Sequence, residues 1–341
     1  MAAIRIIALV LLTLFSISNS VASESNQNKL HHIYGTTMGN KYQVSWRAPV
    51  ATAAQVFALR QTIEQQLDAV NASMSVWQPQ SELSRFNALA AGKPMTLSPQ
   101  LNQVLTLALK IGERSGGALD ITVGPLVKLW GFGPGKQSRA VPNDEAIASV
   151  RTYTGLNTLL LESGRLTKSD GRTEIDLGAI AKGYGVDVIA EVMRASGHRN
   201  FLIDIGGELY ASGQRQPGTP WKVGIDKPFI YSSGQVETLQ LSNQAVATSG
   251  DYRNFFEQAG SRYSHVVDPR TGRAVQTQVV SATVVADRCA EADGLATAAM
   301  VMGVEAAMAM AERDGIAMML IEDHFGRVRL HHSTEFQQFL R

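Results

Sequence analysis

The chain has 341 residues, and its 31 Lys and Arg side chains against 30 Asp and Glu leave a formal net charge of +1. This balance argues against a general electrostatic nucleic-acid interface, so no nucleic-acid partner is expected. Hydrophobic residues at 45% and charged residues at 18% exclude the disordered, collagen-like and coiled-coil classes. The single cysteine, Cys289, excludes an internal disulfide and a cysteine-based metal cluster.

The first segment, residues 1–22, is typical of a secretory signal peptide. Arg5 precedes an apolar run over 6–15, and Ser20 and Ala22 place small residues at positions −3 and −1 of a cut. The run is shorter than the ~20 apolar residues that span a bilayer, which disfavours a permanent anchor. No cysteine stands near the cut, so a lipid-modified N-terminus is not expected. The mature protein is expected in the bacterial periplasm.

Helical periodicity marks the first half of the mature chain. Apolar residues recur at helical spacing over about 52–71 and over 101–111, and Ser115-Gly116-Gly117 stops the second helix. The stretch 77–91 between them is polar and irregular. A third helix is predicted to begin near Asn143, because two acidic residues that suit a helix N-terminus follow it.

Strand signals dominate after residue 155, and helices interrupt them at about 179–196 and 291–312. The predicted strands cover 159–161, 174–177, 201–205, 208–211, 221–225, 236–241, 279–285 and 316–321. Hairpin strands with inserted helices predict an α+β fold of layered, mostly antiparallel sheets with packed helices. No Pro-rich or Ser-rich linker divides the chain, so residues 23–341 are expected to form one domain of two intimately joined lobes.

Two glycine-rich stretches do not fit nucleotide-binding motifs. The 131–136 loop has Trp130 where a P-loop needs glycine, and Gln137 where it needs Ser or Thr. Gly206-Gly207 lacks the three-glycine spacing of a dinucleotide fold. No His-Glu-x-x-His occurs, so a zinc site is not expected.

Two acidic clusters lie beside predicted helix termini. Asp120 follows Gly116-Gly117, where backbone N–H groups can approach a ligand, although a helix stop with a capping Asp explains the same residues. Asp176 and Lys182 flank the start of the helix at 179–196, a place suited to an anion. The alternative is that Asp176 caps the helix and Lys182 is solvated.

Two further clusters carry side chains that their local structure does not need. The sequence Asp268-Pro-Arg-Thr-Gly makes a turn, which requires neither His265 nor Arg270, a candidate base and a candidate anion contact. Asp293 and Thr297 are four residues apart, so a carboxylate and a hydroxyl share one helix face and suit Mg²⁺. The alternative is an acid near a helix N-terminus beside a packed threonine.

The order of these clusters resembles the ApbE-type FAD:protein FMN transferases over about residues 33–325. The shared motifs are Gly35-Thr-Thr-Met-Gly39, Ser81-Glu-Leu-Ser-Arg-Phe-Asn87, Gly116-Gly-Ala-Leu-Asp120, Ile175-Asp-Leu-Gly178 with Ala181-Lys-Gly183, Gly206-Gly-Glu208, Thr248-Ser-Gly-Asp-Tyr252, His265-x-x-Asp-Pro-Arg-Thr-Gly272, and Ala292-Asp293 with Thr297. The resemblance implies an ApbE-like single flavin transferase domain that moves FMN from FAD to a Thr or Ser hydroxyl of a target flavoprotein, releases AMP and requires Mg²⁺.

The resemblance also implies roles for individual residues. The positions that match FAD contacts are Met38, Trp77, Ala118, Leu119, Asp120, Asp176, Lys182 and Val267. Asp293, Thr297 and the backbone carbonyl of Ala179 match metal ligands, and His265 matches the position of a catalytic base or phosphate-positioning group. Targets in the family are commonly subunits of membrane redox pumps or exported flavoproteins. The alternatives are an FAD pyrophosphatase that releases FMN and AMP, and an exported FAD-binding protein without catalysis.

Overall fold

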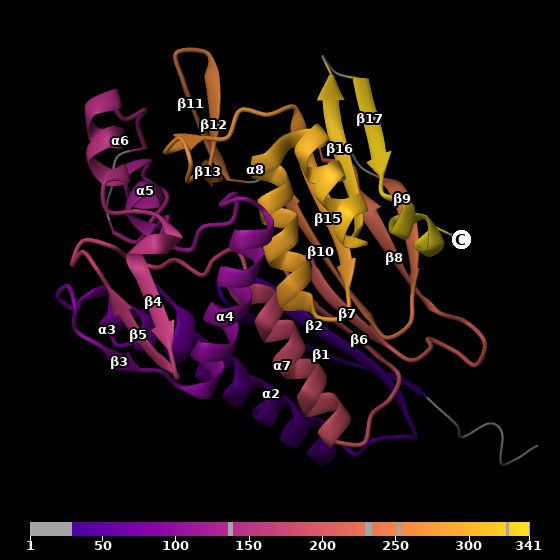
Figure 1. Ribbon diagram of the computed structural model, residues 1–341. Coiled ribbons are helices and arrows are strands. Elements are labelled where there is room, and N and C mark those ends of the chain that lie inside the picture. The colour runs from indigo at the N-terminus through magenta and orange to yellow at the C-terminus, as the bar shows by residue number, and fades with distance from the viewer. Residues whose placement is uncertain (1–28, 136–138, 229–233, 251–253, 325–326, 341) are drawn as a thin grey trace, which may run out of the picture.

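The computed structural model describes residues 29–135, 139–228, 234–250, 254–324 and 327–340. The predicted signal peptide lies outside these residues. At the centre of the fold is an eight-stranded antiparallel sheet in the order β1-β2-β6-β7-β10-β15-β16-β17 (Figure 1). Its strands are β1 (Lys29–Thr37), β2 (Asn40–Ala48), β6 (Phe201–Ile205), β7 (Glu208–Ser212), β10 (Gln244–Gly250), β15 (Val279–Ala286), β16 (Ala317–His324) and β17 (Arg327–His332).

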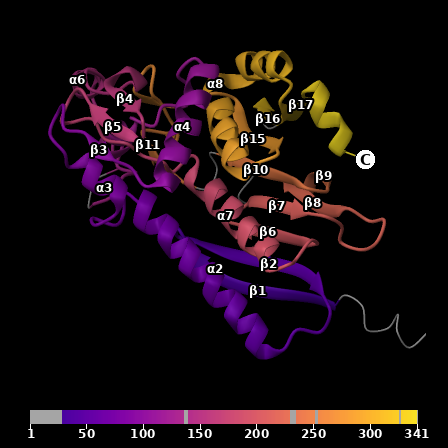
Figure 2. The same cartoon turned by 60° about the horizontal axis from the view of Figure 1, so that its bottom comes forward.

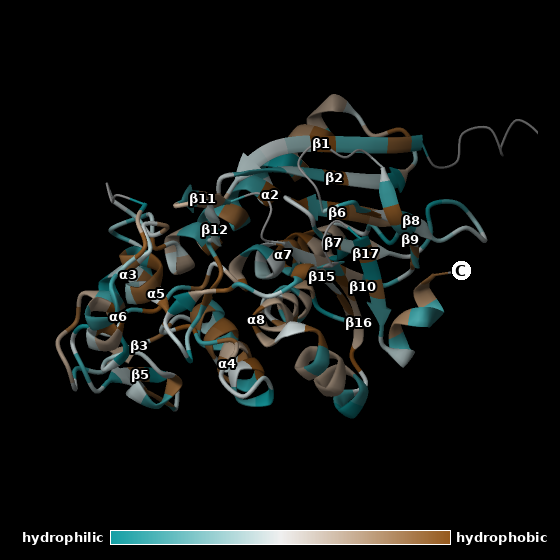
Figure 3. Cartoon of the chain, turned by 90° about the horizontal axis from the view of Figure 1, so that it is seen from above, coloured by the Kyte–Doolittle hydropathy of each residue, from teal (hydrophilic) through white to brown (hydrophobic). Residues whose placement is uncertain are grey.

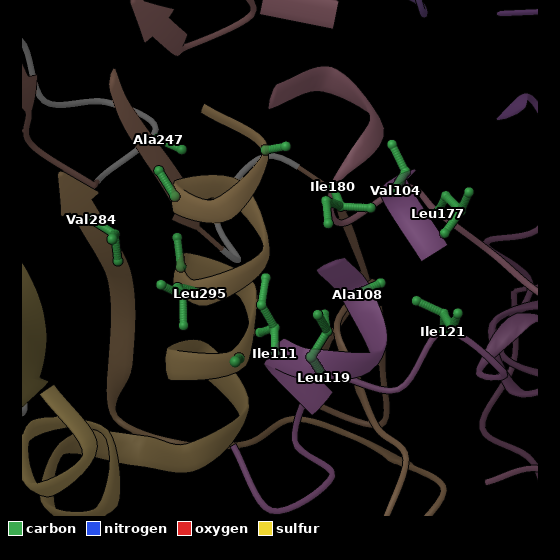
Figure 4. Packing of buried hydrophobic residues seen from close by; sticks show 14 of the residues in the cluster. Val104, Ala108, Ile111, Leu119, Ile121, Leu177, Ile180, Ala247, Val284 and Leu295 are labelled. Atoms are coloured by element: carbon green, nitrogen blue, oxygen red, sulfur yellow. The ribbon is translucent and has the colours of Figure 1, made fainter. Parts of the chain in front are cut away.

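Four long helices lie on one side of this sheet. They are α2 (Ala53–Met74), α4 (Pro99–Arg114), α7 (Ala181–Ala195) and α8 (Cys289–Asp314). Helix α2 lies along β1 and β2, and α7 lies along β6 and β7 (Figure 2). Helix α8 packs between the sheet and α4, with Ala247 and Val284 on its sheet side and Ile111 on its α4 side (Figure 4). The helices and the sheet therefore share a continuous apolar core.

The other face of the sheet is covered by a hairpin of β8 (Trp221–Asp226) and β9 (Gln235–Leu241), and by the 3₁₀ helix η2 (Thr334–Phe339). Val246 and Val285 of the sheet pack against Trp221, Leu239 and Phe336 on this side. A sheet that is apolar on both faces must be covered on both, which explains why strands and helices are layered.

Smaller elements form a group beside α4 and α8, on the side away from the large sheet (Figure 3). They are α3 (Glu82–Asn87), β3 (Met95–Thr96), α5 (Gly124–Leu129), α6 (Asp144–Arg151), η1 (Leu156–Thr158), β4 (Leu159–Glu162), β5 (Arg165–Lys168), β11 (Phe255–Gln258), β12 (Ser261–Ser264), β13 (Val267–Asp268) and β14 (Arg273–Ala274). Part of the group has a separate apolar cluster around Trp130 and Ile147. The α+β class and the mostly antiparallel sheets are confirmed.

Local sequence signals account for the helix starts. Thr52 and Gln55 form a reciprocal capping box at the start of α2, and Ser98 caps α4, which has Pro99 as its first residue. Asn143 caps α6, as predicted. Helix α8 receives no cap from Arg288; instead the carboxylate of Asp187, on α7, accepts hydrogen bonds from Cys289 N and Ala290 N at 2.7 and 3.1 Å.

Two predictions about local structure were wrong. The stretch at 77–91 contains a helix, α3, which Ser81 starts by accepting a hydrogen bond from Ser84 N. The stretch 174–177 is not a strand. Glu174 pairs with Val123 in an isolated parallel bridge that does not extend into a ladder. Its backbone is held by a side chain instead: Asn87 Oδ1 accepts from Ile175 N at 2.8 Å, and Asn87 Nδ2 donates to Ile175 O at 2.9 Å.

Helices α7 and α8 meet where a side chain would not fit. A Cβ atom placed on Gly183 would lie 2.3 Å from the carbonyl oxygen of Cys289, on backbone that has little freedom to move. Gly183→Ala is therefore expected to lower the free energy of unfolding by about 1–3 kcal/mol, measured by urea denaturation. The matched control on the same helix is Gly185→Ala, whose Cβ would meet the flexible tip of Met38 at 3.1 Å.

The control variant is expected to be neutral or stabilising by up to about 1 kcal/mol, because alanine is the better helix former. Equal loss of stability in both variants would show that the close approach of α7 and α8 is not what selects glycine at position 183.

Helix α8 is the helix among the described residues that is long and apolar enough to cross a membrane. In the fold it is a core helix instead, since most of its first half is buried between the sheet and α4. Gly303 interrupts it with a positive φ of 78°, a conformation that glycine adopts without strain.

Candidate active site

A cavity of about 750 Å³ opens where α7 and α8 begin, at the end of β10 and the β6–β7 turn. Its volume is in the range of small-molecule sites. It brings together most of the predicted site residues from segments far apart in the sequence. Those that line it are Trp77, Ala118, Leu119, Asp120, Asp176, Ala179, Lys182, His265, Val267, Asp293 and Thr297. Met38 does not line it, because the tip of its side chain lies near Gly185 on α7.

Three charged side chains meet inside this cavity, two from the beginnings of α7 and α8 and one from the start of β7. Lys182 Nζ lies 2.5 Å from Glu208 Oε1 and 3.6 Å from Asp293 Oδ1. Asp293 Oδ2 accepts a hydrogen bond from Gly183 N at 3.0 Å, in the first turn of α7. Lys182 is 27% exposed and paired with both carboxylates, so it is not the free, solvated lysine of the alternative.

Burial and the neighbouring charges shift the pKa values of these three side chains in opposite directions. Burial raises the pKa of the Glu208 carboxyl, and the adjacent Lys182 ammonium opposes that shift. Burial also raises the pKa of Asp293, against the Lys182 ammonium and the Gly183 N–H. The two carboxyls hold the pKa of Lys182 above its ordinary range despite its burial. Lys182 is thus a cation at neutral pH.

Asp120 and Asp176 are both held by their own turns. Asp120 Oδ1 accepts hydrogen bonds from the backbone N and the hydroxyl of Thr122 at 2.7 and 2.6 Å. Asp176 Oδ1 accepts from Gly178 N at 2.8 Å, so it does not cap α7, which begins after Ile180 without a side-chain cap. Burial raises the pKa of both carboxyls. Each uses one oxygen in these bonds and faces the cavity.

His265 is oriented by a single carbonyl. Its backbone N donates to Asn254 O at 3.0 Å, and its ring Nδ1 lies 3.1 Å from the same oxygen. A carbonyl only accepts, so Nδ1 carries the proton and Nε2 is left as the acceptor. Burial lowers the pKa of the imidazole below its ordinary value of 6.5. His265 is therefore neutral at pH 7, and among the described residues its Nε2 accepts no hydrogen bond.

The proposed metal ligands supply oxygen donors of the kind that Mg²⁺ prefers. Asp293 is buried, and the Thr297 hydroxyl lies 3.1 Å from the Ser249 hydroxyl on β10. The two residues are four apart on α8, and both line the cavity together with Ala179. The described residues contain no group of three or more His, Cys, Asp or Glu that could hold a metal. One carboxylate fits a hard cation that takes its remaining ligands from water or substrate.

Trp77 lies at the edge of the cavity and is 65% exposed, the second largest exposed fraction among the large hydrophobic side chains of the described residues. It stands between α2 and α3, where its backbone N donates to Ser75 Oγ at 3.2 Å. An exposed indole beside a cavity offers a face on which a planar ring can stack.

Glu208 also lines the cavity, although it was not predicted as a site residue. It belongs to the Gly206-Gly207-Glu208 motif, but no role was assigned to it. The feature of the sequence that could have indicated it is a carboxylate placed directly after a glycine turn, at the start of an apolar strand. Two further motif residues, Asp251 and Tyr252, lie outside the described residues.

The sequence model of the ApbE family matches residues 38–320. The chain belongs to the ApbE family. A protein of Vibrio cholerae named FAD:protein FMN transferase is 41% identical over 309 residues, which cover 91% of this chain and 92% of that protein. One of Haemophilus influenzae with the same name is 37% identical and covers 89% of each chain.

Solved structures of the family share the fold. The flavin transferase ApbE of Vibrio cholerae superimposes with a TM-score of 0.85 at 40% identity, over 92% of this chain and all of that one. The flavinyl transferase ApbE of Pseudomonas stutzeri, in its apo form, gives 0.84 at 34% identity, over 92% of this chain and 98% of that one. The family resemblance that the motifs indicated and the fold class predicted from the strand and helix pattern are thus confirmed.

Proposed function

We propose that this protein is an Mg²⁺-dependent FAD:protein FMN transferase, which moves FMN from FAD to a Thr or Ser hydroxyl of a target flavoprotein and releases AMP. The names of its ApbE relatives support the transfer of FMN. The observation that carries the proposal is the meeting of a neutral His265, a cationic Lys182 and the oxygen donors of Asp293 and Thr297 in one cavity.

In the proposed transfer of FMN, each of these side chains has a role in bond formation, proton transfer or charge stabilisation. The acceptor oxygen forms a bond to the phosphorus of the FMN phosphoryl group, and the anhydride bond to AMP breaks. His265 Nε2 takes the hydroxyl proton, because Nδ1 is already bonded to Asn254 O. Lys182 and the first turn of α7 face the negative charge that develops on the leaving phosphate.

The remaining residues bind and orient. Asp293, Thr297 and the carbonyl of Ala179 would hold Mg²⁺, which when bound neutralises the charge of the diphosphate. Asp120 and Asp176 offer carboxylate oxygens at the cavity wall to the hydroxyl and N–H groups of FAD, and Trp77 offers its ring to the flavin. Ala118, Leu119 and Val267 complete the FAD site, with Met38 supporting it from outside the cavity wall.

The test is mass spectrometry of the mature protein incubated with FAD, Mg²⁺ and a candidate acceptor, such as a subunit of a membrane redox pump. The acceptor should gain one FMN group on a Thr or Ser, and EDTA should prevent this. AMP and FMN that appear at the same rate without any acceptor would indicate an FAD pyrophosphatase. FAD that stays bound and intact in both mixtures would indicate a flavin-binding protein without catalysis.

The compartment is part of the proposal. The apolar run after Arg5 and the small residues before Ser23 favour export to the periplasm, where the acceptor would be an exported flavoprotein or the outer face of a membrane protein. N-terminal sequencing of the protein isolated from its host should begin near Ser23 or Glu24. Retention of Met1 on the bulk of the exported protein would contradict cleavage.

A further inference from the structure

One buried carboxylate in the cavity has no part in the steps above. Glu208 is the first residue of β7, and its side chain is 4% exposed. Oε1 contacts Lys182, whereas Oε2 is buried without a hydrogen-bond partner in the described part of the chain. Burying a carboxylate with one oxygen left without a hydrogen bond costs free energy. The presence of Glu208 at this position therefore points to a role, and its contact with Lys182 indicates which one.

The contact determines where the Lys182 ammonium lies. Nζ is 2.5 Å from Glu208 Oε1 but 3.6 Å from Asp293 Oδ1, which is beyond an ordinary hydrogen bond. The other oxygen of Asp293 is taken by Gly183 N at 3.0 Å. Oδ1 is therefore the Asp293 oxygen that can face an incoming cation, and the position of Lys182 controls access to it.

We infer that Glu208 is a positioning residue that holds Lys182 away from Asp293, so that Asp293 Oδ1 stays available to a divalent cation. Without Glu208, Asp293 would be the nearest carboxylate to the ammonium, which would close onto Oδ1. The ammonium would then occupy that oxygen and repel a second positive charge beside it. The inference rests on the metal site proposed above and adds a residue to it.

The test uses Mn²⁺ alone as the probe, with the mature protein and no nucleotide. Electron paramagnetic resonance measures free aqueous Mn²⁺ in a titration. Glu208→Leu removes the acceptor and should weaken Mn²⁺ binding by roughly 10- to 100-fold, the usual effect of losing a residue from the outer shell of a metal site. Glu208→Gln keeps an oxygen that can accept from Lys182, so it should lose less.

Two further variants separate positioning from charge and from folding. Asp226→Asn removes the same formal charge from an exposed residue of the same cavity, and should leave Mn²⁺ affinity within about twofold, as for ordinary surface substitutions. Adding Lys182→Met to Glu208→Leu removes the ammonium itself, and should restore most of the Mn²⁺ affinity. A variant that had merely lost its fold would not be rescued by a second substitution.

The outcomes distinguish this inference from the proposed function. If the wild-type protein binds no Mn²⁺ at millimolar concentration, the metal site is contradicted and the role of Glu208 with it. If it binds Mn²⁺ and Glu208→Leu binds equally well, the inference alone is overturned. A loss that Lys182→Met does not restore, or an equal loss in Asp226→Asn, also overturns it.

Discussion

Replacing His265 by alanine is expected to lower the rate of FMN transfer by roughly 10²- to 10⁴-fold, the usual contribution of a general base. The reason is that Nε2 is the basic nitrogen of the ring, because Nδ1 donates to Asn254 O at 3.1 Å. A base acts on the acceptor hydroxyl as it attacks, so the affinity for FAD should change little. Transfer is measured by the gain of FMN on the acceptor, and affinity by quenching of flavin fluorescence.

The pH profile provides an independent check. Because burial lowers the pKa of His265 below 6.5, the neutral base persists to mildly acidic pH. The rate should therefore fall as the pH drops through a value below 6.5, and His265→Ala should lack this acidic limb. His31→Ala, which removes an imidazole from the edge strand β1, serves as the control. If His265→Ala loses FAD binding as much as transfer, His265 is a binding residue.

Replacing Asp293 by asparagine is expected to remove most of the transfer activity, a loss of roughly a hundredfold or more, since charge stabilisation by a metal contributes several kcal/mol. The amide keeps an oxygen that can accept from Gly183 N, so the meeting of α7 and α8 should be preserved. What is lost is the one formal negative charge among the proposed metal ligands. The measurement is the transfer rate against Mg²⁺ concentration.

High Mg²⁺ should restore only part of the activity of Asp293→Asn, because ligand geometry is lost together with affinity. Thr297→Val should be milder, since water can replace a neutral ligand, although its contact with the Ser249 hydroxyl is also lost. Wild-type activity of Asp293→Asn across the titration would place the metal elsewhere and leave Asp293 as a partner of Lys182 and Gly183.

Sequence patterns were sufficient for features that depend on neighbouring residues. The long helices follow from apolar spacing and from caps such as Thr52, Ser98 and Asn143, all of which act within one turn. The same holds for the hairpin strands bounded by glycine, and it explains why the α+β class could be predicted. The order of short motifs was enough to indicate the ApbE family, because each motif combines unusual residues with a turn or a helix start.

Local patterns gave wrong or missing predictions where contacts with a distant part of the chain determine the backbone conformation. The stretch 174–177 alternates like a strand, but the side chain of Asn87 binds its backbone at Ile175 and prevents a ladder. Strands β1 and β2 were not predicted, although Tyr42, Val44 and Trp46 alternate toward the core. Their burial depends on α2 and α7, and a strand with one short apolar alternation needs such partners to be stable.

The chemical groups near the helix termini and turns can be read from the order of amino acids alone: Asp120, Asp176, Lys182, His265 and Asp293. How these groups act on one another depends on the folded arrangement. It places Glu208 against Lys182 and Asn254 O against His265, and it brings the first turns of α7 and α8 together at Gly183. The physical reason is that pKa shifts, tautomers and ion pairs depend on distances between atoms, and distances across a core are set by packing rather than by spacing along the chain.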